Sequence, residues 1–483
     1  MDMTLIAGSA LASGPEIIVI IGACAALMIS LLPNARQENL LASLSIIIIA
    51  LAAGMSFALP ESSQREYSGM FVVDSFSKYF KMVLYLATAL TVLMSGKYLV
   101  KEGVVKGEYY VLLLFALVGT MIMVSGTDLL IIYVGIELQA ISIYVLVGFL
   151  KADARSNEAA LKYIILGAFS SGILLYGMSL FYGLSGTTNL DAIAEALFSP
   201  DFDNPMLLMA TLFMLVGLLF KVGAVPFHMW VPDIYEGAPS PITAFMSVAA
   251  KAAAFAVILR IFLDELFVLS PIWLLGVSGI AILSMALGSL AALVQTNIKR
   301  MLAYSSIAHA GFLLLGLIAG GANGVASIMQ YVVVFTFMNL GMFAIIILLN
   351  KGVKFGEPIE SFAGLSKTHP MLALMTMIFL FSLAGIPPTG GFFVKFYVLL
   401  ALIETGYIWL AVIAVLLSAV AAWFYLRIIM LMYVHEPSVK PDIHITLPMQ
   451  IVLAVTVLGT VLTGIFPTWL LEAARSAALL GMG

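Results

Sequence analysis

Four ionisable side chains lie in the middle of long apolar stretches, and they are the residues in this sequence best placed to do chemistry. Glu137 lies within LLIIYVGIELQAISIYVLVGF, and Lys221 lies within MLVGLLFKVGAVPFHMW. Lys251 and Lys395 lie within FMSVAAKAAAFAVI and FSLAGIPPTGGFFVKFYVLL. Burial favours the uncharged form of either residue type, whereas a neighbour of opposite charge favours the ionised form. Movement of such a neighbour would move a proton, so the set favours a proton relay over static ion pairs.

Two histidines are weaker candidates for the same chemistry. His228 lies in PFHMW and His309 in YSSIAHAGFLLLG. A lone histidine in an apolar helix can equally be a packing residue or a proton carrier, and both interpretations stay open here. Glu158 and Lys162 are spaced i,i+4, which favours an interfacial ion pair.

Other cations lie near the ends of apolar stretches. A long basic side chain can reach the membrane surface while its stem stays in apolar surroundings. We expect this behaviour of Lys78, Lys81, Arg260 and Arg427.

Prolines interrupt two of the lysine-bearing stretches. Pro226 follows Lys221, and the run Pro387, Pro388, Thr389, Gly390, Gly391 precedes Lys395. Proline removes a helical hydrogen bond and clashes with the preceding turn. Such a break is tolerated at membrane depth only where protein or water satisfies the freed backbone groups. Both breaks are therefore expected to line a pathway.

The elements that carry these residues are membrane helices. Of the 483 residues, 63% are hydrophobic and only 10% are charged, against about 25% in soluble proteins. A helix needs about 20 apolar residues to cross a bilayer. Hydropathy predicts an all-α polytopic membrane protein with fourteen spans, at about 15–32, 40–60, 71–95, 109–125, 127–150, 160–184, 205–229, 240–265, 272–296, 299–320, 325–350, 370–403, 408–434 and 446–470.

Charge asymmetry between the loops predicts the orientation. If the N-terminus is outside, the outer loops and tails hold only Arg65 and Arg475, and the loop between helices six and seven is acidic. Cytoplasmic loops normally carry the excess of cations. We therefore predict both termini on the outer side. The twelve cytoplasmic cations would be Arg36, Lys97, Lys101, Lys106, Lys151, Arg155, Lys299, Arg300, Lys351, Lys354, Lys367 and Lys440.

The two breaks suggest an internal repeat. Helices seven and twelve are five spans apart and therefore run in opposite directions. Interrupted helices at corresponding positions of two inverted repeats are typical of transport pathways. Within a single membrane domain, 1–483, we predict N-terminal helices in 1–108, a first five-helix repeat (helices 4–8) in 109–265, an inverted second repeat (helices 9–13) in 272–434 and a last helix in 446–470.

Several kinds of site are not predicted. There is no dinucleotide fingerprint, no P-loop and no HExxH motif. Cys24 is the only cysteine, so cysteine-held iron–sulfur clusters are excluded, and five histidines form no convincing metal cluster by spacing. No basic stripe favours nucleic acid. We expect no cofactor and no metal in this chain.

Five stretches carry a resemblance to a known family: GIELQAISIYVLVGF, NEAALKYIILGAFSSG, FKVGAVPFHMWVPDIYEGAPSPITAFMSVAAKAAAF, TNIKRMLAYSSIAHAGF and LAGIPPTGGFFVKFYVL. Over nearly its whole length the sequence resembles the antiporter-like membrane subunits of bacterial respiratory complex I. Within that group, DIYEGAPSPITAF followed by a lysine in the next helix resembles the subunit N type. Lys395 fits this type as well, because the related M type usually has glutamate there.

The resemblance implies roles for the four charged residues. Glu137 matches the glutamate of helix five that partners a lysine, and Lys221 matches the lysine of the broken helix. Lys251 matches the lysine thought to connect two half-channels, and Lys395 matches the residue on the exit side of helix twelve. His228 and His309 remain lesser candidates for the relay.

The resemblance also implies a function. The chain is expected to be a proton-translocating subunit of NADH:quinone oxidoreductase in the bacterial inner membrane, with other membrane-arm subunits as partners. NAD, FMN, iron–sulfur clusters and quinone are expected in other subunits of the complex. One alternative is a subunit of a multi-subunit sodium/proton antiporter, since those subunits share the fold. Another is a non-pumping structural subunit whose charges are static pairs.

Overall fold

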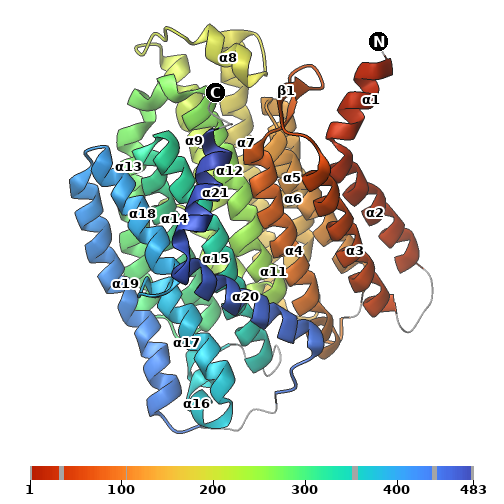
Figure 1. Cartoon of the computed structure of the whole chain (residues 1–483), viewed down its shortest axis with the longest axis vertical. Helices are drawn as coiled ribbons and strands as arrows, with labels where there is room; N and C mark the ends of the chain where they lie inside the picture. Colours follow the sequence, from red (N-terminus) through yellow and green to blue (C-terminus); the bar gives the residue numbers. More distant parts are fainter. Residues whose placement is uncertain (1–2, 32–36, 105, 351–356, 438–442, 480–483) are drawn as a thin grey trace.

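The computed structural model describes residues 3–31, 37–104, 106–350, 357–437 and 443–479. Four of the predicted cytoplasmic cations, Arg36, Lys351, Lys354 and Lys440, lie outside the described residues. Within the described part, long helices lie side by side along one axis (Figure 1). The predicted all-α polytopic membrane fold is confirmed.

The first half of the chain forms twelve α-helices, one short hairpin and three other short helical segments up to residue 269. Their bounds are α1 Met3–Ala12, α2 Gly14–Ser30, α3 Gln37–Ala58, β1 Ser62–Glu66, β2 Phe71–Val73, α4 Ser75–Lys101, α5 Glu108–Ser125, α6 Leu129–Val147, α7 Ala154–Ser185, α8 Leu190–Ala196, α9 Pro205–Val222, α10 Trp230–Gly237, α11 Ser240–Phe245, the π-helix η1 Met246–Ala250, α12 Lys251–Leu259, the π-helix η2 Arg260–Glu265 and the 3-10 helix η3 Phe267–Leu269.

The second half also consists mainly of long helices. The bounds are α13 Ser270–Leu293, α14 Ile298–Ala319, α15 Gly321–Leu349, the 3-10 helix η5 Ile359–Phe362, α16 Leu365–Thr368, α17 Pro370–Ala384, α18 Gly390–Glu404, α19 Ile408–Val434, α20 Leu447–Ile465 and α21 Pro467–Leu479.

Among the described residues, twelve helices are long and apolar enough to cross a membrane. They coincide with twelve of the fourteen predicted spans. The predicted span 15–32 falls on α2, which has 17 residues, and the span 370–403 is divided between α17 and α18, which have 15 residues each. The most deeply buried segments are 240–265, α14 and α15. Two of these three carry Lys251 and His309, so the candidate residues lie in the centre of the bundle.

One predicted boundary is wrong. The span predicted at 71–95 begins with β2, which pairs antiparallel with β1, and the helix α4 begins only at Ser75. Asp74 ends the strand because its carboxylate accepts a hydrogen bond from the backbone of Ser77, while the Ser77 hydroxyl accepts one from the Asp74 backbone. This reciprocal capping box fixes the helix start more firmly than hydropathy can.

The two predicted helix breaks are confirmed, and they share one backbone motif. Gly223 ends α9 with φ 73° and Gly385 ends α17 with φ 82°. Gly223 N–H donates to Phe220 O and Ala224 N–H donates to Leu219 O; the second break has the corresponding pair of bonds from Gly385 and Ile386. This double bond is the Schellman arrangement, which needs a residue at positive φ and therefore favours glycine.

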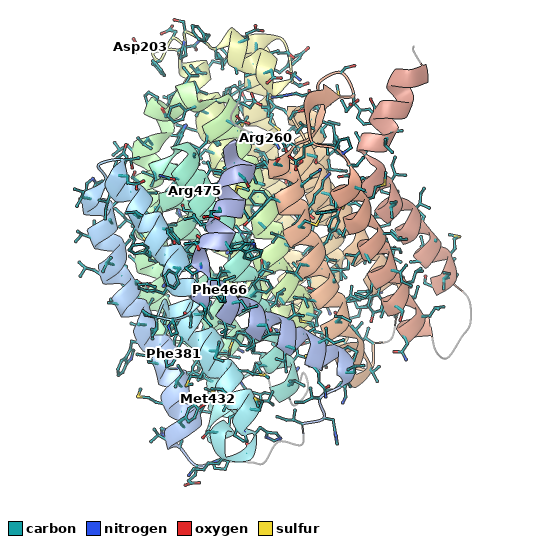
Figure 2. The ribbon with its side chains drawn as sticks, viewed as in Figure 1. Asp203, Arg260, Phe381, Met432, Phe466 and Arg475 are labelled. Atoms are coloured by element: carbon teal, nitrogen blue, oxygen red, sulfur yellow. The ribbon has the colours of Figure 1, made fainter. Side chains whose placement is uncertain are left out.

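Both ends of the chain lie toward the end of the molecule that carries α8, while α16 lies at the opposite end (Figure 1). Figure 2 shows Asp203 at this α8-bearing end and Arg260 further inside the bundle. At the same end, Arg65 forms ion pairs of 2.5 Å with Asp191 and with Glu265. The termini and the acidic segment around α8 therefore share one face, as the predicted topology requires.

Two of the cations expected to reach the surface are buried instead, and a third, Arg427, is partly buried. Lys81 is 2% exposed and pairs with Glu16 at 2.6 Å. Arg260 is 4% exposed and pairs with Asp74 at 3.0 Å. The guanidinium of Arg427 donates to the carbonyls of Leu293 and Gln295 at the end of α13. Each finds a specific acceptor on another element, which a hydropathy pattern cannot reveal. Lys78 stays near the surface, where its ammonium donates to Leu59 O.

Candidate functional site

Glu137 and Lys221 interact electrostatically without forming a direct ion pair. Glu137 lies in the middle of α6, and its Oε1 is buried with no hydrogen-bond partner among the described residues. Lys221 lies in the last turn of α9, one residue before Val222 ends the helix. Glu137 is the charged residue that acts on Lys221, yet no ion pair joins them. Because these two opposite charges are not in direct contact, a small movement of either helix changes the strength of their attraction.

Lys251 lies directly after the π-helix η1, as the first residue of α12. It is 4% exposed. Its ammonium donates to the hydroxyl of Ser306 at 2.5 Å and to the Ser306 carbonyl at 3.1 Å. A Cβ placed on Gly223 would lie 3.8 Å from Lys251 Nζ, so this lysine reaches the break that follows Lys221. A π-turn of this kind is often found where a helix must present a functional side chain.

Lys395 binds the backbone carbonyls that the second break exposes. Its ammonium donates to the carbonyls of Leu383 and Ala384, at 3.2 and 3.0 Å, and to the Ser418 hydroxyl at 3.0 Å. It also lies 5.0 Å from the ring centroid of Phe312. The two carbonyls are the last of α17, where the helix dipole concentrates negative charge. The break therefore supplies the partner for a cation at this position.

His309 is held between two tyrosines. Its Nδ1 is 2.7 Å from the Tyr331 hydroxyl, and its Nε2 is 3.3 Å from the Tyr425 hydroxyl. The histidine is 3% exposed, and the charges of Lys395 and Lys251 both act on it. Its hydrogen bonds are satisfied, as a packing residue requires, and it is within electrostatic range of both lysines, as a relay residue requires.

His228 is placed differently. It lies in the non-helical segment between α9 and α10, where its backbone carbonyl accepts a bond from Val231. No hydrogen bond among the described residues connects its side chain to Lys221 or Lys251. The structure thus brings Lys251, His309 and Lys395 into one electrostatic group and leaves His228 beside the first break.

Five polar residues of this region were not predicted. Ser306 binds Lys251 and Ser418 binds Lys395. Tyr331 and Tyr425 bind His309, and Ser305 binds Tyr425. Only the serine pair gave a signal, since it lies beside His309 in YSSIAHAG. Ser418 and Tyr425 lie in the apolar helix α19, where a single hydroxyl is not distinguished from an ordinary packing residue.

A charged cluster ties α10 to both halves of the molecule. Asp233 of α10 pairs with Lys162 of α7 and with Arg300 of α14, each at 2.8 Å. Arg300 also pairs with Glu236 at 3.0 Å. The predicted pair of Glu158 and Lys162 is confirmed, also at 2.8 Å. The side chains of this cluster are 29% to 64% exposed, as expected at a membrane boundary.

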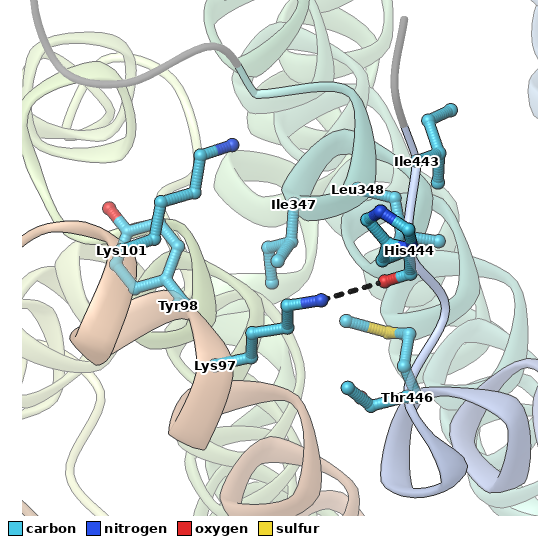
Figure 3. A pocket seen from close by; sticks show the side chains of 9 residues that line it. Lys97, Tyr98, Lys101, Ile347, Leu348, Ile443, His444 and Thr446 are labelled. Carbon is cyan, nitrogen blue, oxygen red and sulfur yellow. Dashed lines mark hydrogen bonds between the residues drawn. The ribbon is translucent and has the colours of Figure 1, made fainter.

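A pocket of about 200 Å³ lies apart from this set, at the ends of α4 and α15 and the start of α20 (Figure 3). Lys97 and Lys101 line it together with Tyr98, Ile347, Leu348 and Met449, and none of the relay candidates does. Lys97 Nζ donates to the His444 carbonyl at 3.1 Å across one side. In the described part of the chain, no group of three or more histidine, cysteine or acidic side chains could hold a metal ion.

Comparison with known proteins decides the family. The family described as NADH:quinone oxidoreductase/Mrp antiporter, TM matches residues 126–421. NADH-quinone oxidoreductase subunit N 2 of Rhizobium meliloti (strain 1021) is 56% identical over 472 residues, which cover 98% of each chain. The chain belongs to the NADH:quinone oxidoreductase/Mrp antiporter family. Within this family it is an antiporter-like membrane subunit of the subunit N type, as the sequence predicted.

Solved structures of this family share the fold. A chain of respiratory complex I from Thermus thermophilus, solved with bound aureothin, superposes with a TM-score of 0.80 at 29% identity, covering 95% of this chain and 98% of that one. A chain of the Mrp complex from a Dietzia strain superposes with a TM-score of 0.85 at 22% identity, covering 98% and 99%. The second likeness concerns the fold alone. The family match, residues 126–421, includes all six relay candidates and about half of α19.

Proposed function

We propose that this chain translocates protons as the subunit N of a proton-pumping NADH:quinone oxidoreductase in a bacterial inner membrane. The observation that carries the proposal is a group of buried ionisable residues that reaches both helix breaks. Lys251 lies next to Gly223 at the first break, and Lys395 donates to the Ala384 carbonyl at the second. His309 is buried in the same core. Three ionisable residues in the core of an apolar bundle are costly unless they have a function.

The relay begins at Glu137 and Lys221. Quinone reduction elsewhere in the complex shifts charge along the membrane arm, and the separation of this pair changes. Because the pair has no direct contact to break, a small movement is enough to change the proton affinity of Lys221. Lys221 then passes its proton toward Lys251, which reaches the same break. Lys395 releases a proton on the other side of His309, which carries protons between the two lysines.

The remaining parts of the reaction belong to other subunits in this proposal. NAD, FMN, the iron–sulfur clusters and quinone bind elsewhere, and this chain contributes no redox centre. Its partners are other membrane-arm subunits, among them further antiporter-like subunits. Both termini face the outer side of the membrane. Residues 109–265 and 272–434 act as two inverted repeats, each with one interrupted helix, and the half-channels meet at Lys251 and His309.

The test uses the intact complex. Lys221→Ala and Lys395→Ala complexes are purified, reconstituted into vesicles and assayed for NADH:quinone reductase activity and for protons moved per NADH. We expect assembled complexes with a reduced proton ratio. Wild-type stoichiometry in both variants would refute the relay. Sodium-driven proton flux in vesicles without an electron donor, and no reductase activity in the co-purifying material, would assign the chain to an antiporter instead.

A further inference from the structure

Helix α19 presents two hydroxyls to the relay candidates. Ser418 and Tyr425 are seven residues apart, which is about two turns, so they lie on one face of the helix. The Ser418 hydroxyl accepts the bond from Lys395 Nζ at 3.0 Å. The Tyr425 hydroxyl contacts His309 Nε2 at 3.3 Å and also the hydroxyl of Ser305. One helix face therefore touches both members of the second half of the proposed relay.

The Tyr425 hydroxyl has the properties of a proton carrier. Tyr425 is 1% exposed, so bulk water does not compete for its hydroxyl. A hydroxyl is a donor and an acceptor at once. It bridges the imidazole of His309 and Ser305, and the next residue, Ser306, accepts the bond from Lys251. Packing alone would require only the ring, which lies 4.1 Å from that of Phe424, centroid to centroid.

We propose that Tyr425 carries protons between the Lys251 side and His309, and that Ser418 positions the ammonium of Lys395 by accepting its hydrogen bond. This inference rests on the proposed function. In each transfer the hydroxyl oxygen of Tyr425 accepts a proton from the Ser305 side as its own proton passes to His309 Nε2. The phenol therefore ends neutral, and no charge is created on it. Ser418 takes no part in the transfer itself and holds Lys395 beside the second break.

The experiment compares Tyr425→Phe with Tyr85→Phe in the whole complex. Tyr85 is the matched control because its buried hydroxyl also bonds a serine, Ser56, at 2.8 Å, but outside the relay. We expect Tyr425→Phe to assemble, to pump several-fold more slowly and to show a changed pH profile of pumping. Tyr85→Phe should keep the wild-type rate and profile. A lowered amount of complex with an unchanged pH profile would mean a structural role and would overturn the inference.

Two further variants separate this inference from the proposed function. If Lys251→Ala and Lys395→Ala stop pumping while Tyr425→Phe pumps normally, the inference fails and the relay stands. If both lysine variants pump normally, the relay itself fails. Should Tyr425→Phe not assemble, Ser418→Ala decides, because it is a smaller change on the same helix face. Normal pumping by Ser418→Ala would then count against the α19 hydroxyls.

The pocket of Figure 3 carries a second, independent inference. It lies where three candidate spans end or begin, at Lys101, Leu349 and Leu447, and thus at the level of lipid head groups. Two exposed lysines line it, while Ile347, Leu348 and Met449 supply an apolar wall. Basic pockets between membrane helices at this level bind anionic lipid head groups. We infer that an anionic phospholipid occupies it, with its phosphate at Lys97 and Lys101.

The test counts lipids bound to the purified complex after exchange into dioleoylphosphatidylglycerol or dioleoylphosphatidylcholine. We expect one retained phosphatidylglycerol, bound roughly 30-fold more weakly in Lys97→Gln/Lys101→Gln, because each lysine near a membrane surface adds about 1 kcal/mol of attraction. Lys106→Gln/Lys151→Gln changes charge equally outside the pocket and should bind normally. An equal loss of bound phosphatidylglycerol in both double variants would overturn the lipid site. So would displacement of the bound phosphatidylglycerol by inorganic phosphate alone.

Discussion

The two helix breaks have the same backbone conformation, but their lysines differ in the hydrogen bonds that they make. Both end in the Schellman arrangement with a glycine at positive φ. At the second break, Lys395 donates three hydrogen bonds, two of them to the carbonyls that the break exposes. At the first break, Lys221 lies before the interruption and has no hydrogen bond to a described residue. Here Trp230 Nε1 donates to the Phe220 carbonyl instead, at 2.9 Å.

The difference separates two uses of one motif. A lysine that satisfies exposed carbonyls stabilises the break and stays in place, because removing it would leave buried acceptors without a donor. A lysine without such bonds can change its position or its protonation when a nearby charge such as Glu137 moves. We therefore interpret the second break as a fixed station for a cation and the first as the element that responds to the rest of the complex.

The largest effect is expected from Lys395→Met. This substitution removes the charge and leaves the Leu383 and Ala384 carbonyls and the Ser418 hydroxyl without their donor. An unsatisfied buried polar group costs about 1–3 kcal/mol. We expect loss of proton pumping together with a lower temperature of thermal unfolding of the subunit in the purified complex. Lys395→Arg, which keeps a donor, should recover most of the stability. Full stability in Lys395→Met would contradict the fixed-station interpretation.

Lys221→Met should remove pumping without this loss of stability. The Lys221 side chain makes no hydrogen bond to a described residue, so we expect the same unfolding temperature as wild type within the error of the measurement. In the double variant Glu137→Gln/Lys221→Met, pumping should remain lost. A static buried pair behaves oppositely: each single change destabilises by about 3–5 kcal/mol and the neutral double variant recovers. Recovery of full pumping in the double variant would support the static interpretation.

A smaller effect on stability and pumping is expected when Gly223 or Gly385 is replaced by alanine. A residue with a Cβ in the left-handed conformation costs about 1–2 kcal/mol. At Gly385 the new Cβ would lie 2.9 Å from Lys395 Cδ, whereas at Gly223 it would lie 2.6 Å from Val231 Cγ2. We expect similar destabilisation of both variants by thermal unfolding. Only Gly385→Ala should displace a directly bonded ammonium, so it should pump less. Equal pumping by both variants would contradict this.

Much of the fold could be predicted because the bilayer imposes simple rules on length and hydropathy. The spans, the two breaks and the centrally placed Lys251, His309 and Lys395 followed from apolar runs and prolines. The contacts did not. Whether Lys81 reaches the surface or pairs with Glu16 depends on a carboxylate 65 residues away in the sequence, brought close only by packing. Likewise, the hairpin before Asp74 depends on local capping that apolar composition hides.

The smallest effect is expected at the charged cluster that anchors α10, the helix after the first break. α18, the helix after the second break, has no ion pair among the described residues, so the cluster is a feature of the first break alone. Within it, Asp233 contacts two cations from two helices, whereas Glu158 contacts only Lys162 and is 64% exposed. An exposed i,i+4 pair contributes about 0.3–0.5 kcal/mol.

Glu158→Gln should therefore leave the unfolding temperature and pumping unchanged, and Asp233→Asn should lower the unfolding temperature more. If α10 must be anchored for Lys221 to respond to Glu137, Asp233→Asn should also slow pumping, and Glu158→Gln is its matched control because it removes one carboxylate from the same cluster. Equal behaviour of the two variants would show that the cluster is only a solvated surface and that the first break is held by its backbone.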